Sequence, residues 1–159
     1  MAGRFYVVIK AKYSLELSKL ATPTRLIGIR AGGPQDMQYL LLIYGEEARW
    51  NEIEQKERDA VLEEYMSFTK SIAQSGYYRG GNELHRTLRA KTVRLRNGKR
   101  VVTDGPFAET KEALGGYYLI EAGDIDEAVE IAARIPSVRW GSVEIRPIIP
   151  HGAFGQRTV

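Results

Sequence analysis

Apolar and polar residues alternate with two different periods from residue 37 onward, and these periods outline the predicted elements. The run MQYLLLIYG (37–45) is short, almost wholly apolar and closed by glycine, which is typical of a buried β-strand. Asn51, followed three residues later by Glu54, resembles a capping box and predicts the start of a helix. Apolar side chains then recur every three or four positions up to Gly76, which predicts an amphipathic helix of about six turns. They are Val61, Leu62, Tyr65, Phe68, Ile72 and Ala73.

The segment KTVRLRNGKRVVTDG (91–105) has the pattern of a β-hairpin. Val93 and Leu95 alternate with arginines, and the return strand RVV follows at 100–102. The pair Asn-Gly at 97–98 is the one that a type I′ turn favours, because both of its central positions need a positive φ. The pattern therefore predicts two antiparallel strands joined by a two-residue turn.

Three further elements follow the hairpin. GGYYLIEA (115–122) is rich in tyrosine and predicts a β-strand. Asp124, with Glu127 at the third position, predicts the start of a helix, whose apolar residues continue at helical spacing until Pro136 ends it. SVEIRPIIP (142–150) alternates apolar and charged residues, which predicts a final strand closed by proline.

The order strand, helix, hairpin strands, helix, strand is that of a ferredoxin-like βαββαβ fold with an added hairpin strand, in the α+β class. This layout places both helices on one face of an antiparallel sheet and leaves the other face bare. The strands YLLLIY and YYLI offer few clean solvent-facing positions. We therefore expect a homodimer, in which two sheets pack face to face and close a dimeric α+β barrel.

Composition limits the class of protein. The chain has 159 residues, of which 43% are hydrophobic and 27% charged, and this suits one globular domain. The absence of cysteine excludes disulfides, thiolate nucleophiles and cysteine-bound metals, and it is consistent with the cytoplasm, where we expect the protein. No apolar run approaches the roughly 20 residues of a membrane helix, so no membrane partner is expected.

The net charge of +3 is unevenly distributed. Residues 1–36 contain six Lys/Arg and two Asp/Glu, a balance of +4, whereas residues 37–159 contain 17 and 18, a balance of −1. A nearly neutral main body argues against a nucleic-acid partner. The basic, acid-poor segment 1–36 shares features with an organelle transit peptide, but its Gly-Gly-Pro end favours an extension outside the folded domain. The predicted domain is 37–149, and 150–159 is a tail.

Three stretches resemble a known family: YLLLIYGEEARW, LRAKTVRLRNGKRVVTDGPFAETKEALGGYYLIEAGDIDEAVEIAARIP and GSVEIRPI. They are similar to the YCII-related family. The motif Asp-Gly-Pro-Phe at 104–107, followed by Glu109, Lys111 and Gly116, resembles its DGPF branch. The resemblance covers the whole predicted domain and implies a dimeric α+β barrel. Arg86 is one departure, because the family usually has a proline there, and it bears on the shape of that loop.

The resemblance implies no single function. Most proteins of the DGPF branch have none assigned, while the wider superfamily includes lactone isomerases and dehalogenase-like enzymes that act on aromatic breakdown products. Many DGPF genes lie beside genes for extracytoplasmic-function sigma factors. The histidine–aspartate pair suggested for some YCII relatives has no clear histidine counterpart in this chain.

Asp104 has two interpretations. A carboxylate that follows a strand and is held by Gly105-Pro106 is suited to act as a general base at the mouth of the barrel. Aspartate before glycine also commonly hydrogen-bonds the backbone of its own turn. The neighbouring motif residues are predicted to be structural, with Pro106 fixing the turn and Phe107 anchoring it in the core. Gly105 and Gly116 complete this structural set.

Four other residues are candidate ligand-binding groups. Lys111 lies in a charged run, where it can pair with a substrate carboxylate near Asp104 or face solvent. Arg94 and Arg146 lie on predicted strands, and they would bind an acidic ligand if they point inward. Otherwise they pair with glutamates of neighbouring strands or cover an edge. Tyr44 is predicted either to line a pocket for an aromatic ligand or to pack in the sheet.

His85 lies in GGNELHRTLRA, which we interpret as a loop that can bring it to the mouth of the barrel. It is a second, weaker candidate for catalysis. The two histidines of the chain have no local metal-ligand spacing, so no metal is expected. No G-x-S-x-G elbow, P-loop or dinucleotide-binding fingerprint occurs, and no cofactor is expected.

Two hypotheses of different classes follow. In the first, the protein is a cofactor-independent enzyme, lyase- or isomerase-like, acting on a small acidic or lactone-type metabolite. Asp104 would move a proton, while Lys111 or an arginine holds the anion. In the second, it is a non-catalytic dimer that senses a ligand or binds a regulator such as an extracytoplasmic-function sigma factor.

Overall fold

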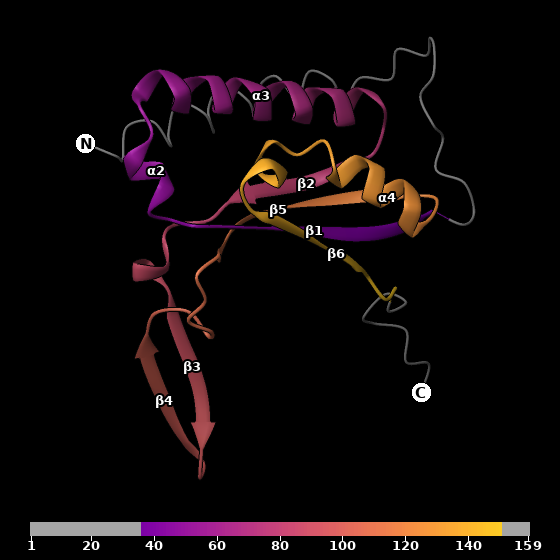
Figure 1. Cartoon of the computed structure of the whole chain (residues 1–159). Coiled ribbons are helices and arrows are strands. Elements are labelled where there is room, and N and C mark those ends of the chain that lie inside the picture. Colours follow the sequence, from indigo (N-terminus) through magenta and orange to yellow (C-terminus); the bar gives the residue numbers. More distant parts are fainter. Residues whose placement is uncertain (1–35, 151–159) are drawn as a thin grey trace, which may run out of the picture. The chain divides into compact units, whose positions relative to one another are not determined.

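The computed structural model describes residues 36–150, so the predicted extension (1–36) and tail (150–159) lie outside it apart from Asp36 and Pro150. Figure 1 shows the arrangement of its elements. In chain order they are β1 (Met37–Gly45), α2 (Arg49–Glu52), α3 (Gln55–Gln74), β2 (Tyr78–Glu83), the 3₁₀ helix η1 (Thr87–Arg89), β3 (Lys91–Arg96), β4 (Lys99–Asp104), β5 (Ala113–Ala122), α4 (Ile125–Ala132), the 3₁₀ helix η2 (Pro136–Arg139) and β6 (Ser142–Pro147).

The strands form a four-stranded sheet and a separate two-stranded sheet. The larger sheet has the order β2-β5-β1-β6, and all of its neighbouring strands are antiparallel. This order, with α3 and α4 as the two crossover helices, confirms the predicted ferredoxin-like α+β fold. The predicted hairpin, β3–β4, is present but lies outside the larger sheet, and β2 pairs with β5 in its place.

Strand β2 falls partly on a segment that the sequence analysis interprets as a loop. Its sequence, YRGGNE, has little of the apolar alternation that predicts a strand. Its glycines instead allow the strand to lie very close to β5. A Cβ on Gly81 would lie 2.8 Å from Cδ1 of Tyr118 and 2.9 Å from the backbone oxygen of Tyr117. Contact with β5 therefore determines this strand, rather than local propensity.

The predicted start of the long helix is wrong. Asn51 lies inside the short helix α2, and the extended backbone of Ile53 (ψ 148°) separates α2 from α3, which begins after Glu54. The Asn51 side chain accepts a hydrogen bond of 2.8 Å from Arg86 instead of capping a helix. The second helix start is confirmed, because the carboxylate of Asp124 accepts a 2.8 Å bond from the backbone nitrogen of Glu127.

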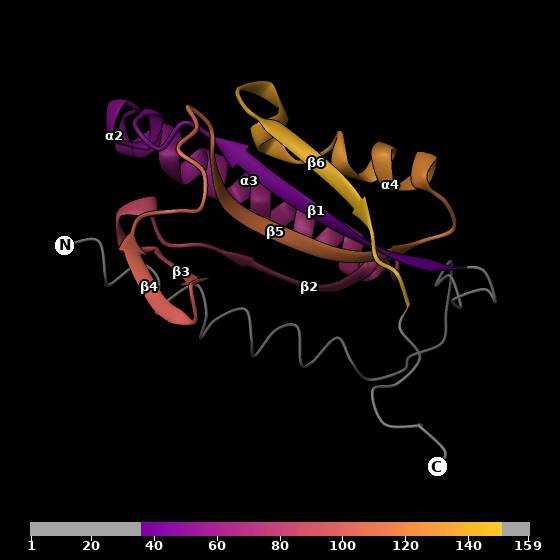
Figure 2. The same cartoon turned by 90° about the horizontal axis from the view of Figure 1, so that it is seen from below.

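Both long helices cover one face of the larger sheet, as predicted (Figures 1 and 2). The core between them is built from alternate strand residues and from one stripe of each helix. The largest fully buried side chains are those of Leu41, Ile72, Ile120 and Ile135. Burying a side chain of this size contributes about 1.5–3 kcal/mol, so this layer stabilises the domain.

Within residues 36–150, no helix lies against the opposite face of the sheet, as Figure 2 shows. Because side chains alternate along a strand, Leu40, Leu42, Tyr117 and Leu119 point to this face. All four are partly exposed. The expected homodimer would bury them, and it stays a prediction.

Candidate functional site

The Asp-Gly-Pro-Phe motif forms the end of β4 and the loop that follows it. Gly105 has φ 88°, a left-handed conformation that strongly favours glycine. Its backbone nitrogen donates to the oxygen of Ala90 (2.9 Å), and its oxygen accepts from Oγ1 of Thr92 (2.9 Å). The loop is therefore fastened to the base of the hairpin.

Asp104 lies at the end of β4, directly opposite Lys91 in the hairpin register. Its carboxylate pairs with the Lys91 ammonium, and 81% of the Asp104 side chain is exposed. The carboxylate thus binds a neighbouring strand rather than the backbone of its own turn. Its predicted role as a general base stays a prediction, and its side chain is not among those that line the cleft described below.

The prediction that Phe107 anchors the loop in the core is wrong. Phe107 is 81% exposed. The guanidinium of Arg94 lies 5.6 Å from the centre of its ring, which is cation–π geometry. The physical reason is the position of the loop, which follows a hairpin outside the larger sheet and so lies away from the core beneath α3 and α4.

Beside this loop lies an open cleft of 530 Å³, which we call the DGPF cleft. Its volume suits a small organic molecule. Three segments form it: the connection from β1 to α2, the helix η1 and the loop after β4. Its lining side chains and backbone belong to Glu46, Glu47, Ala48, Thr87, Leu88, Gly105, Pro106, Ala108, Glu109, Thr110, Lys111 and Ala113.

Lys111 and Glu46 form an ion pair on the lining of the cleft. Nζ of Lys111 lies 2.8 Å from Oε1 of Glu46, and the two side chains are 82% and 41% exposed. The hydrogen bond to Glu46 and its negative charge raise the pKa of Lys111 above the usual value. Lys111 was a sequence-predicted site residue, and its predicted contact with a substrate carboxylate stays a prediction. In the sequence, Glu46 could have been recognised as a site residue only by its position directly after a predicted buried strand.

Glu47 holds one wall of the cleft in place. Its Oε1 accepts a 2.6 Å bond from the backbone nitrogen of Thr87, and its Oε2 accepts a 2.9 Å bond from the Thr87 hydroxyl. Both oxygens thus bind the first residue of η1. Arg86 stands immediately before it. The Glu47–Thr87 contact and the Arg86–Asn51 bond fix the shape of this loop.

The other ligand-binding candidates lie on different elements. Arg94 is on the hairpin, whereas Arg146 is on β6, where its Nε lies 3.6 Å from Oε1 of Glu144. Tyr44, on β1, donates a 3.2 Å hydrogen bond to Oε2 of the same glutamate. Burial and this bond raise the pKa of Tyr44. The structure therefore gathers Tyr44 and Arg146 around Glu144 and leaves Arg94 apart from them.

His85 and Gly116 do not line the cleft. His85 is exposed in the connection between β2 and η1. Gly116 is buried in β5, where an added Cβ would lie 3.0 Å from the backbone oxygen of Asn82. This glycine allows β5 and β2 to approach each other closely.

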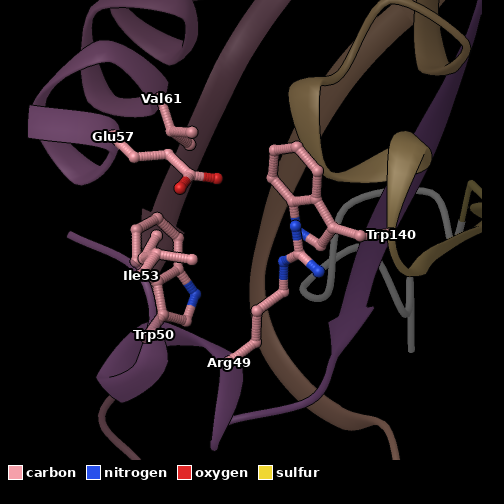
Figure 3. A pocket seen from close by; sticks show the side chains of 6 residues that line it. All are labelled: Arg49, Trp50, Ile53, Glu57, Val61 and Trp140. Atoms are coloured by element: carbon pink, nitrogen blue, oxygen red, sulfur yellow. The ribbon is translucent and has the colours of Figure 1, made fainter.

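A second hollow lies at the other side of α2, and Figure 3 shows the side chains around it. The guanidinium of Arg49 lies 5.2 Å from the ring centre of Trp140, and that of Arg139 lies 4.8 Å from it. The enclosed volume is only 10 Å³, roughly room for a single water. The hollow is therefore a packing contact between α2 and the end of η2.

Residues 36–150 contain neither a metal-binding cluster nor a membrane-spanning helix. No group of three or more His, Asp or Glu side chains in that range is placed to hold a metal ion. Nor does any helix in it have the length and apolar character needed to cross a membrane.

Two comparisons with known proteins bear on this site. The family described as the YCII-related domain matches residues 37–151, which include the whole DGPF cleft and both sheets. An uncharacterised protein of Rhizobium meliloti (strain 1021) is 33% identical over 114 residues, which is 70% of this chain and 92% of that relative.

Proposed function

The chain belongs to the YCII-related domain family, and from that premise we propose that it is a cofactor-independent small-molecule enzyme of the DGPF branch. The observation that supports this most is the DGPF cleft of 530 Å³, with a carboxylate and an ammonium paired on its lining. A concave site with a few convergent polar groups is the usual form of a small-molecule site.

The lining favours a small carboxylate or lactone with an apolar skeleton. Leu88 is 74% exposed, and with Pro106 and Ala108 it offers an apolar surface inside the cleft. The Glu46–Lys111 pair is exposed to solvent, where water screens the attraction between the two charges and the pair adds little to stability. A ligand carboxylate or carbonyl oxygen can therefore replace Glu46 at Lys111 at little cost. The carboxylate of Glu46 then faces the bound ligand.

This exchange suggests a proton-transfer mechanism. Glu46 removes a proton from the carbon next to the ligand carbonyl, and Lys111 stabilises the negative charge that develops on the oxygen. Return of the same proton to another carbon completes an isomerisation, which consumes no oxidant or reductant. In this scheme Glu46 takes the role that the sequence analysis gives to Asp104.

A ligand screen with three variants tests the proposal. Thermal shift is measured against small carboxylates, lactones and phenolic metabolites, because a ligand that binds only the folded state raises the melting temperature. We expect a shift in the wild type and in Asp104→Asn, and a lost shift in Lys111→Ala. Glu46→Gln should keep the shift and lose turnover of any hit that reacts.

Two outcomes would count against this scheme. If Asp104→Asn abolishes turnover while Glu46→Gln keeps it, Asp104 is the base and our assignment of Glu46 is wrong. If no compound in a broad library shifts the wild type, the enzyme proposal fails. The regulatory hypothesis, with an extracytoplasmic-function sigma factor as partner, then becomes the one to test.

We also propose that the protein is a homodimer formed through the open face of the sheet. The partly exposed Leu40, Leu42 and Leu119 on that face support it, because contiguous apolar patches commonly mark protein contacts. Sedimentation analysis should show a dimer for the wild type and a monomer for Leu42→Asp. A dimer that is unaffected by Leu42→Asp would place the contact elsewhere.

A further inference from the structure

The β3–β4 hairpin extends away from the four-stranded sheet (Figure 1). It is fastened at its base through Gly105, whose backbone bonds Ala90 and Thr92. Its two strands pair only with each other among the described residues. Each therefore leaves one edge without a strand partner there, and such edges are templates for contact with another chain.

One face of this hairpin is aliphatic. Directly opposite residues of an antiparallel pair point to the same side, so the pairs Val93–Val102 and Leu95–Arg100 share a face. Val93 is 59% exposed, Leu95 76% and Val102 51%. Three neighbouring aliphatic side chains this exposed favour a protein contact more than solvent.

The hairpin is also strongly basic, on a domain that is acidic. Residues 91–104 contain five Lys/Arg and one Asp, a balance of +4, whereas the other described residues contain 11 basic and 18 acidic side chains, a balance of −7. Lys91 pairs with Asp104, and Arg94 lies over the ring of Phe107. Arg96, Lys99 and Arg100 form no ion pair with any other residue in the range 36–150.

We infer that the β3–β4 hairpin is a docking arm for a second copy of this chain, whose acidic domain it contacts through its aliphatic face, which also carries Arg100, and through Arg96 and Lys99 beside the turn at its tip. The net charge of each candidate partner of the hairpin distinguishes between them. Another hairpin, at +4, or the extension 1–36, also at +4, would be repelled, whereas the rest of the domain, at −7, attracts the arm. Nucleic acid would match the charge but leave the aliphatic face exposed. In a two-fold dimer the contact occurs twice.

The inference rests on the proposed homodimer. A matched pair of variants tests the role of the hairpin separately from dimerisation itself. Leu95→Asp and Thr103→Asp make the same charge change on the same hairpin, but they lie on opposite faces. By sedimentation equilibrium we expect Leu95→Asp to raise the dimer dissociation constant about tenfold or more, and Thr103→Asp to change it less than about threefold. Raising the NaCl concentration from about 50 mM to about 500 mM should also weaken the wild-type dimer.

The outcomes are distinct. A wild type that stays monomeric overturns both the homodimer and the arm. A dimer that Leu42→Asp abolishes but Leu95→Asp leaves unchanged overturns the arm alone. Equal effects of Leu95→Asp and Thr103→Asp would also overturn it, because charge rather than the aliphatic face would then be responsible.

Cross-linking locates the contact directly. The chain has no cysteine, so Leu95→Cys supplies a single attachment point for a thiol-linked photo-crosslinker. Mass spectrometry of the cross-linked dimer should find the label on residues 36–90 or 105–150 of the second copy. A cross-link found only on residues 91–104 of the second copy, or no cross-link between chains, would overturn the inference. A wild-type sample carried through the same labelling is the control.

Discussion

The four-stranded sheet and the β3–β4 hairpin contain the same kinds of residues in opposite environments. In the sheet, Leu41 and Ile120 are fully buried beneath α3 and α4. In the hairpin, Val93 and Leu95 alternate with arginines just as regularly, yet both are mostly exposed. Alternation therefore determines that a segment can form a strand. It does not determine whether another layer covers the apolar side.

The two regions also differ in what holds them. The sheet has a helical layer on one face, and its strand order brings together segments that lie far apart in the sequence. The hairpin is held by its own register, by the Asn97-Gly98 turn and by the bonds of Gly105. Local interactions are sufficient for the hairpin, whereas the sheet depends on tertiary packing.

Truncation of an aliphatic side chain should show the largest difference between the two regions in the free energy of unfolding. Ile120→Ala leaves a cavity in the core and should lower the free energy of unfolding by about 2–5 kcal/mol. Leu95→Ala, on the exposed hairpin, should change it by less than about 0.5 kcal/mol in protein diluted below the dimer dissociation constant, where no partner covers the hairpin. Urea denaturation of both variants measures these values. Similar losses for the two would mean that the hairpin packs against the domain in solution.

Adding one methyl group to neighbouring glycines of β2 tests the close approach of β2 to β5. Gly81→Ala would push a Cβ within 2.8 Å of the Tyr118 ring and should cost about 1–3 kcal/mol of stability. A Cβ on Gly80 meets nothing within 4 Å, so Gly80→Ala is the matched control. Equal thermal stability of the two variants would show that β2 and β5 are not so closely packed.

Tyr118 should make the stability of the sheet depend on pH in the alkaline range. Burial raises its pKa from the usual 10.0 to about 12, although a hydrogen bond with Thr69 opposes the shift. In the unfolded chain this phenol ionises first, so its contribution to stability is complete below pH 10.0 and is lost as the pH rises through about 12.

Tyr118→Phe checks the sign of this effect. The variant should lose about 1 kcal/mol at neutral pH, because it removes one hydrogen bond. Above pH 10.0 its stability should fall less steeply than that of the wild type. Denaturation curves between neutral and alkaline pH give both values, and absorbance titration of the phenols follows the ionisation directly. Parallel curves at alkaline pH would contradict the buried position of the hydroxyl.

The smallest effect is expected at Asp104. Its pair with Lys91 is exposed, and such pairs contribute about 0–1 kcal/mol, so Asp104→Asn should leave the melting temperature almost unchanged. Added salt should remove even this difference. A large loss of stability would instead reveal a structural role for the carboxylate in the loop.

Several parts of the site could be predicted from local sequence. The turn at Gly105 and the candidate Lys111 came from residue types in a short motif, because a left-handed glycine and a charged loop are local properties. Glu46 and Glu47 were not predicted. They follow β1, some 40 residues before the helix η1 and further still from Lys111, and only the tertiary fold brings them to one cleft. Phe107 was placed in the core because its residue type favours burial, but no other part of residues 36–150 buries it.

The sequence by itself determined the kinds of elements, most of their order and the α+β class, because hydrophobic period, caps and turn residues act over a few neighbouring positions. Tertiary structure alone decided three things: that the glycine-rich segment Tyr78–Glu83 is a strand, that the hairpin stands outside the sheet, and that Glu46 rather than Asp104 meets Lys111. Each depends on contacts between segments distant in the chain. Their free energies come from packing and charge across space, which local residue patterns do not encode.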